Sequence, residues 1–468
     1  MQPTPVTEEA LGKGRDQASA VSEIPLAVRF CWGTLCLATL LNANGVAVLA
    51  GEPQGFLSLP LLGLVATVLY GMRHEARYMA RPPASWVYLF FAGYLATGLL
   101  SACLSSYGDP WRAITAGLRN HCASLAVGTA GYFAATHASR AGRVDSLLRW
   151  LFWPCAAAAL SGLVLPAHPV VGDQLELSET LGNRMEGVFT NTNELGLQSG
   201  YPIVLGLVLS LRTGKTFWLA VGMASGAVGV VASFSKAAMF ALALLIPYVG
   251  WVGWKARAKL RGVGWAALLT GVGAAFAAGF LLSGAVQGTS SLDLDEDQQD
   301  RLEAIYRFAT TGTVDDDLTT GRVDIWHECI GIWLTSPTLG TGLSTFDVVP
   351  GLELNSHNQF LTVLGESGLL GAAFLALALC GTIAALRRIE PGPTRALALG
   401  FLLVQFPLWM SSGQALCLRD HNLVAGCVLG LVAAAMPKSA PTRKTPHRRS
   451  TGSPSEAEPR SKEVRRQR

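Results

Sequence analysis

The chain has 468 residues, of which 50% are hydrophobic and 15% are charged, and its mean hydropathy is +0.36. A soluble domain of average composition carries about a quarter charged residues, so this balance excludes an ordinary water-soluble enzyme. The net charge of +4 excludes little, because in a membrane protein the position of each Lys and Arg matters more than their sum. Nine cysteines without a CxxC pair give no zinc or thioredoxin signature, and we predict no metal centre.

Apolar runs of about 20 residues, the length that crosses a bilayer, recur along the chain. They predict an all-α, polytopic membrane protein with about 12 transmembrane helices. The polar residues 1–25 are expected to form a cytoplasmic N-terminal segment, and they contain no pattern of a cleavable signal peptide. The predicted spans are 28–50, 56–72, 85–106, 113–136, 148–168, 194–211, 216–234, 237–254, 263–286, 358–386, 396–412 and 421–437.

The predicted orientation follows from the short loops, because Lys and Arg resist translocation and gather on the cytoplasmic side. Every second predicted loop is basic, and an even number of spans puts all of these loops and both termini on that side. The tail at 438–468 carries ten Lys and Arg against three Glu, and we expect it to be disordered and held near anionic lipid. The basic loop residues are Arg73, Arg77, Arg81, Arg140, Arg143, Arg149, Arg212, Lys215, Lys255, Arg257, Lys259, Arg261, Arg387, Arg388 and Arg395.

Two segments on the opposite side, about 169–193 and 287–357, are too long to be simple turns. In the second, Arg322, Trp326 and residues further on recur at helical spacing and predict a helix. Such a helix could lie along the membrane surface or cap a cavity, and an ordinary packed loop helix is an equal alternative.

Several charges break the orientation rule and are therefore informative. Charged groups that persist inside or at the edge of a span tend to face a cavity, so we expect an anion site on the outer side. A phosphate group, a carboxylated sugar and an inorganic anion would all fit. Arg119, His121 and Glu366 lie deeper, and Glu366 is a candidate partner for one of the cations. The outer basic residues are Arg184, Lys236, Arg307, Arg322, His357 and Arg419.

Four pieces of sequence have a more specific meaning: NRMEGVFTNTNELG at 183–196, SFSKAAM at 233–239, GRVDIWHECIGIWLTSPTLGTGLSTF at 321–346 and NSHNQFLTVLGESGLLG at 355–371. In order and spacing they resemble the O-antigen ligase and polymerase family of bacterial envelope glycosyltransferases. The most specific part of the pattern is Gly-Arg, a Trp-containing helix, Pro and Gly-x-Gly, followed by His-Asn and two glycines. Here these residues are Gly321, Arg322, Trp326, Pro337, Gly340, Gly342, His357, Asn358, Gly368 and Gly371.

The resemblance implies a GT-C-like glycosyltransferase domain at 26–437, with a family-like core at 183–371 and a long periplasmic loop at 287–357. It implies a donor glycan on undecaprenyl diphosphate and an acceptor that is either a lipid A core sugar or the next lipid-linked repeat. Transfer would take place at the periplasmic face of the bacterial inner membrane, without a metal ion, cofactor or nucleotide sugar. The implied products are lipopolysaccharide or exopolysaccharide. Membrane lipids and a polysaccharide chain-length regulator are further expected partners, and nucleic acid is not.

The resemblance also implies roles for individual residues. His357 would be the catalytic base that takes the proton from the acceptor hydroxyl, because a neutral imidazole can do so near neutral pH. Arg184, Lys236 and Arg322 would bind the diphosphate and stabilise the charge of the leaving group. Lys236 matches a position that is often Arg in relatives and lacks the bidentate geometry of a guanidinium. The glycines would allow tight turns or close helix approach. The supporting polar residues are Asn193, Asn358 and Glu366.

Alternatives stay open at this point. The motifs do not distinguish a ligase from an O-antigen or exopolysaccharide polymerase, since only the acceptor differs. A polysaccharide flippase or an anion transporter would also have twelve spans with cations inside the membrane, but we find no repeat relating two halves of the chain. Cys329 and Cys417 both fall on the outer side and could pair, and we assign no disulfide to them.

Overall fold

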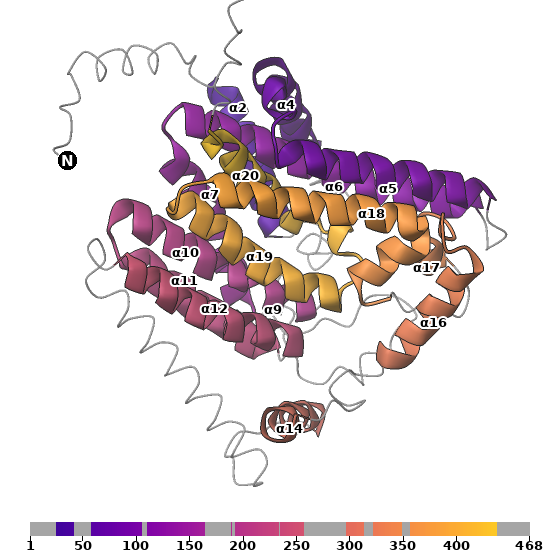
Figure 1. Cartoon of the computed structure of the whole chain (residues 1–468). Helices are drawn as coiled ribbons and strands as arrows, with labels where there is room; N and C mark the ends of the chain where they lie inside the picture. The colour runs from indigo at the N-terminus through magenta and orange to yellow at the C-terminus, as the bar shows by residue number, and fades with distance from the viewer. Residues whose placement is uncertain are drawn as a thin grey trace, which may run out of the picture. The chain divides into compact units, whose positions relative to one another are not determined.

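The computed structural model describes residues 25–41, 58–104, 110–163, 189, 192–233, 235–256, 296–312, 322–348 and 356–437. Within these ranges the secondary structure is helical throughout, without a strand, which confirms the all-α class (Figure 1). The elements are α2 Leu26–Leu40, α4 Ser58–Glu75, η2 Ala76–Tyr78, α5 Ala84–Leu104, α6 Pro110–Arg140, α7 Val144–Ser161, α9 Thr192–Gln198, α10 Gly200–Thr213, α11 Phe217–Ser233, α12 Lys236–Lys255, α14 Glu296–Thr311, α16 Arg322–Thr335, α17 Thr345–Val348, α18 Gln359–Arg388, α19 Pro393–Ser411, η3 Ala415–Cys417 and α20 Arg419–Ala435.

Every predicted span except the ninth overlaps helix in the structure, and the sixth is built from α9 and α10, which follow one another at Ser199. The ninth span, 263–286, and most of the outer segment 169–193 lie outside the described residues, so the count of twelve stays a prediction. The helix predicted to begin at Arg322 is α16. Five described helical segments are long and apolar enough to cross a membrane: Ala84–Leu104, Thr192–Thr213, Lys236–Lys255, Gln359–Arg388 and Pro393–Ser411.

Helices α6 and α20 pack with their backbones in close contact. A Cβ added to Gly426 of α20 would lie 1.9 Å from the carbonyl oxygen of Gly128 of α6, so this crossing admits only glycine. One helical turn further along α6, a Cβ on Gly131 would lie 2.5 Å from the carbonyl oxygen of Leu423. In lipid the hydrophobic effect does not drive helices to associate. Small residues at such crossings let the two backbones approach closely, so that van der Waals contacts stabilise the pair.

Residues from two of the basic loops contact acidic residues of neighbouring helices. Arg140 at the end of α6 forms an ion pair with Glu75 at the end of α4, with 2.6 Å between Nη1 and Oε1. Arg212 at the end of α10 forms an ion pair with Asp145 in the first turn of α7. The structure therefore brings together residues that the sequence predicts on one side of the membrane. We call this end of the bundle the basic end.

At the opposite end, residues 337–343 lie against both α5 and α18, and we call them the strap. On α5, Ser101 Oγ donates to the carbonyl of Gly340, and the amide of Leu343 donates to the carbonyl of Gly98 at 3.0 Å. On α18, the amide of Thr341 donates to the carbonyl of Gly365 at 2.8 Å. These bonds fasten the segment that follows α16 to two helices of the bundle.

Helix α18 is interrupted where the strap meets it. Gly368 has φ of 62° and ψ of −160°, a conformation that side chains with a Cβ rarely adopt. The amides of Leu369 and Leu370, which follow the break, donate to the carbonyls of Pro337 at 2.9 Å and Thr338 at 3.3 Å. The strap thus satisfies backbone groups that the break removes from the helical ladder, as interrupted helices in a membrane require. The expectation that Gly368 serves a turn and a close approach is confirmed.

Candidate active site

The site is built where α16 begins and where the chain enters α18. Trp326, one turn into α16, donates its indole N–H to the carbonyl of Ser356 at 3.1 Å. Arg322 lies four residues earlier, on the same face of the helix, and is the first residue of α16. This bond therefore holds the start of α16 beside the residue that follows Ser356, which is His357.

His357 occupies a strained position at the entrance to α18. It is half-buried, and its φ of 48° is uncommon for a residue with a side chain. Its neighbour Asn358 is the N-cap of α18, with Oδ1 accepting hydrogen bonds from the amides of Phe360 at 3.0 Å and Leu361 at 3.3 Å. The side-chain oxygen of Asn358 is thus used in helix capping, which fixes the backbone on the C-terminal side of His357.

Arg322 acts electrostatically on His357. The pKa of His357 is lowered to about 4, first by burial of the imidazole and second by the positive charge of Arg322. His357 is therefore neutral at pH 7, the form in which an imidazole can accept a proton. A neutral base beside a guanidinium is an arrangement that can deprotonate a hydroxyl and bind an anionic leaving group.

Three of the outer basic residues begin a helix: Lys236 begins α12, Arg322 begins α16 and Arg419 begins α20. The N-terminus of a helix carries positive partial charge, so a cationic side chain there costs roughly 0.3–1 kcal/mol when nothing compensates it. The same placement adds a side-chain charge to free amide donors and favours an anion. Arg307 differs, because it lies inside α14 and forms an ion pair with Glu303, with 3.8 Å between Nε and Oε1.

The start of α12 is organised by Ser235 and Asn193. Ser235 is the N-cap, and its Oγ accepts from the amide of Ala238 at 3.4 Å and donates to Oδ1 of Asn193 at 2.9 Å. Asn193 belongs to α9, so this bond joins the beginnings of two helices. Lys236 directly follows the cap and is half-buried.

The 3-10 turn η3 lies between the start of α12 and the start of α18. Ala415 of η3 packs in one apolar cluster with Ala238 near the start of α12. The next residue, Leu416, donates its amide to Oε1 of Gln359, the first residue of α18, at 2.9 Å. The helix starts that carry Lys236 and follow His357 therefore both lie near η3.

Glu366 lies deeper and belongs to a buried polar network at the break of α18. Its side chain is 2% exposed and accepts a hydrogen bond from the hydroxyl of Tyr94 on α5. Tyr94 Oη also lies 3.4 Å from Nε2 of His121 on α6, and His121 Nδ1 lies 3.5 Å from Sγ of Cys417 in η3. From the sequence we expected a cation beside Glu366 and did not identify Tyr94. Nothing in the sequence around Tyr94 distinguishes it from other aromatic residues in the predicted spans. His121 could be identified from the sequence as a candidate, because it is an ionisable residue inside a predicted span.

The comparisons with known proteins bear on the segment that carries this geometry. Residues 220–376, about a third of the chain, match the family described as O-antigen ligase. This segment is similar to the O-antigen ligase family. The resemblance seen in the sequence motifs is therefore confirmed. No curated protein matches the chain.

The O-antigen ligase segment contains most of the candidate site. Lys236, Arg322, His357, Asn358 and Glu366 all fall within it, as do the strap and the break of α18. Asn193 precedes the segment. Arg184 also precedes it and lies outside the described residues, so its place beside the other cations stays a prediction.

No group of three or more His, Cys, Asp or Glu side chains that could hold a metal ion is present in the part of the chain that the structure describes. Cys329 and Cys417, which the sequence left as a possible pair, are not joined to each other by a disulfide.

Proposed function

We propose that this protein transfers an oligosaccharide or polysaccharide from undecaprenyl diphosphate to an acceptor hydroxyl at the periplasmic face of the bacterial inner membrane. The match of residues 220–376 to the O-antigen ligase family supports a ligase- or polymerase-type activity in general. The observation that carries the proposal to particular residues is the placement of Arg322 beside a neutral His357.

In the proposed reaction the acceptor hydroxyl oxygen bonds to the anomeric carbon while the bond from that carbon to the diphosphate oxygen breaks. His357 takes the hydroxyl proton, and undecaprenyl diphosphate leaves with the electron pair of the broken bond. Arg322 and Lys236, with Arg184 as a further candidate, stabilise the negative charge that grows on the leaving diphosphate. No step requires an oxidant, a metal ion or a nucleotide sugar.

The proposed orientation rests on the basic loops. Lys and Arg concentrate in the loops that end α4, α6, α10, α12 and α18, so these loops and both termini are assigned to the cytoplasm. The cationic helix starts and His357 then face the periplasm, where the acceptor would be. The acceptor is either a lipid A core sugar, for a ligase, or the next lipid-linked repeat, for a polymerase, and a chain-length regulator would act on the latter.

The catalytic proposal is tested by expressing His357→Ala in a strain that lacks the wild-type protein. We expect loss of surface polysaccharide with accumulation of the lipid-linked intermediate, while the variant still inserts in the membrane. Normal polysaccharide in that strain would contradict a catalytic base at this position. Arg322→Lys keeps the positive charge and loses the bidentate geometry of the guanidinium. It should therefore impair transfer more than the matched substitution Arg388→Lys at the basic end.

The acceptor is tested by the glycans of the deletion strain. Lipid A core that carries one repeat indicates a lost polymerase, and bare core with long chains still on the lipid carrier indicates a lost ligase. Loss of a secreted polymer alone indicates an exopolysaccharide polymerase. Lipid-linked glycan retained on the cytoplasmic leaflet would instead favour a flippase.

A further inference from the structure

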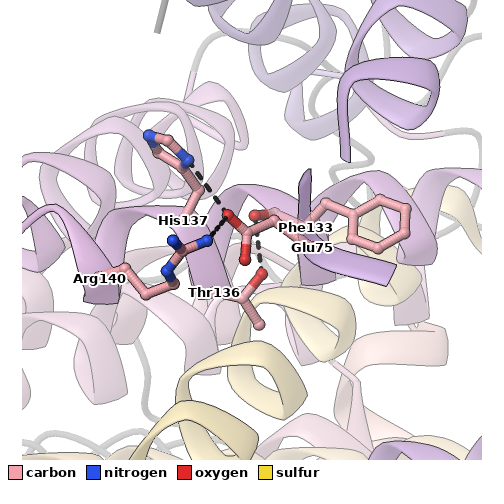
Figure 2. A network of polar contacts seen from close by, with 5 residues as sticks. All are labelled: Glu75, Phe133, Thr136, His137 and Arg140. Carbon is pink, nitrogen blue, oxygen red and sulfur yellow. Dashed lines mark hydrogen bonds and ion pairs between the residues drawn. The ribbon is translucent and has the colours of Figure 1, made fainter. Parts of the chain in front are cut away.

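The basic end of the bundle contains a buried carboxylate that organises a group of cations. Glu75, at the end of α4, is fully buried, and its Oε1 lies 2.6 Å from Arg140 Nη1 and 3.4 Å from His137 Nδ1 of α6. Figure 2 shows both side chains directed at this carboxylate, with Thr136 bonded instead to the backbone of Phe133. Glu75 thus supplies one negative charge at the point where α4 meets α6.

Three arginines surround the next aromatic residue, Tyr78 of η2. The guanidinium carbons of Arg81, Arg77 and Arg140 lie 4.4, 5.2 and 5.8 Å from the centre of its ring. The backbone carbonyl of Tyr78 accepts a hydrogen bond from the hydroxyl of Tyr132 on α6 at 2.6 Å, and this bond fixes the backbone that carries the ring. We call Arg77, Tyr78, Arg81 and Arg140 the arginine corner.

The arginine corner has more positive charge than the described carboxylates balance. Glu75 pairs with Arg140, whereas no ion pair to a described carboxylate involves Arg77 or Arg81. Cation–π contact with Tyr78 holds the two guanidinium groups near each other despite their like charge. An anion with several oxygen atoms would relieve this repulsion and match the geometry of the guanidinium forks.

The surface of α4 indicates which anion reaches the corner. Leu61, Val65, Leu69 and Met72 are 59%, 46%, 63% and 57% exposed, and their spacing places them in one stripe along the helix. In a membrane protein such an exposed apolar stripe contacts lipid chains. The stripe ends one turn before Arg77, at the level where a headgroup would lie.

We propose that the arginine corner binds the phosphate of an anionic phospholipid, whose chains lie along the apolar stripe of α4. Arg77 and Arg81 contact the phosphate oxygens. Arg140 is neutralised by its ion pair with Glu75 and packs against Tyr78 beside them. The lipid belongs to the leaflet at the basic end, opposite to the candidate active site. The proposal does not depend on which glycan the protein transfers, and it distinguishes these arginines from loop residues that only set the orientation.

The test uses the full chain in nanodiscs of phosphatidylcholine with increasing fractions of phosphatidylglycerol. Bound phosphatidylglycerol is counted by native mass spectrometry, and thermal unfolding is followed in parallel. Each arginine near a charged lipid surface contributes about fivefold in affinity, so Arg77→Gln/Arg81→Gln should weaken phosphatidylglycerol binding roughly 25-fold. The matched control Arg387→Gln/Arg388→Gln removes two exposed arginines at the end of α18, outside the arginine corner, and should weaken phosphatidylglycerol binding clearly less than the corner variant does.

Three results would overturn the proposal: no preference of the wild type for phosphatidylglycerol, an equal loss in the control pair, or equal binding of inorganic phosphate in phosphatidylcholine nanodiscs. The last would identify a soluble phosphate ligand instead of a lipid. If the double variant fails to fold, Arg77→Gln alone carries the test, because Arg77 is exposed. Its expected loss is about fivefold, and unchanged binding would refute the site.

Discussion

Replacing Arg322 with Gln removes the positive charge that acts on His357 and is expected to raise the pKa of that imidazole. In the wild type the pKa falls from 6.5 to about 4, and burial is the larger of the two causes. Arg322 is the smaller cause, so the loss of its charge in Arg322→Gln should reverse less than half of this drop. Because a lowered histidine pKa favours the neutral form, the variant keeps a protonated His357 to a higher pH than the wild type does.

Deuterium exchange at the imidazole C2 position, followed by mass spectrometry across a pH series, measures this pKa without an activity assay. Arg307→Gln is the matched control, because it removes an outer arginine that pairs with Glu303 inside α14. An unchanged pKa in Arg322→Gln, or an equal rise in Arg307→Gln, would refute the assigned proximity of Arg322 and His357. Inorganic pyrophosphate should raise the pKa of His357 in the wild type, since a bound anion offsets Arg322, and should have less effect in Arg322→Gln.

Three further substitutions test the supporting structure. Gly368→Ala should reduce the amount of folded protein, because a Cβ there would lie 2.3 Å from the carbonyl oxygen of Thr338 and the backbone has a positive φ. Gly331→Ala is the control, because open space surrounds Gly331 and no loss is expected. Thermal unfolding in detergent compares the two variants. Tyr94→Phe removes one hydrogen-bond donor from the buried carboxylate of Glu366, and a loss of about 1–3 kcal/mol is expected in the free energy of unfolding. Asn358→Ala removes the cap of α18 at a cost of ~1 kcal/mol, so it should lower the unfolding temperature slightly, and an unchanged temperature would contradict the capping role.

The positions of the helices could be predicted because each depends on a local property of the chain. A run of apolar residues has to bury its backbone polar groups in a helix when it enters lipid, whatever its neighbours are. The helix at Arg322 and the unusual placement of the outer cations were likewise visible as local pattern and local charge. The sequence therefore indicated which ionisable residues needed an explanation.

The partners at the break of α18 could not be predicted in the same way. The Gly-Glu-Ser-Gly stretch at 365–368 favours a turn, but the interruption at Gly368 exists because the strap, some 30 residues earlier, supplies the missing hydrogen-bond partners. The partner of Glu366 was missed for a related reason, since Tyr94 meets it only through the lateral packing of α5 against α18. Which helices are neighbours depends on the whole bundle, and a single sequence without an alignment carries no direct record of it.

The hydrogen bonds between the strap and the interrupted α18 have a consequence for membrane insertion. An unpaired amide or carbonyl in hydrocarbon costs several kcal/mol, so Leu369 and Leu370 cannot reach their final conformation before Pro337 and Thr338 have returned to the bundle. In the topology predicted from the basic loops, the strap belongs to the outer loop, so this loop has to cross the membrane and fold back before α18 is complete. In the predicted topology, biogenesis therefore includes a step in which a translocated segment completes a transmembrane helix, and deletion of the strap is expected to change the form in which α18 inserts.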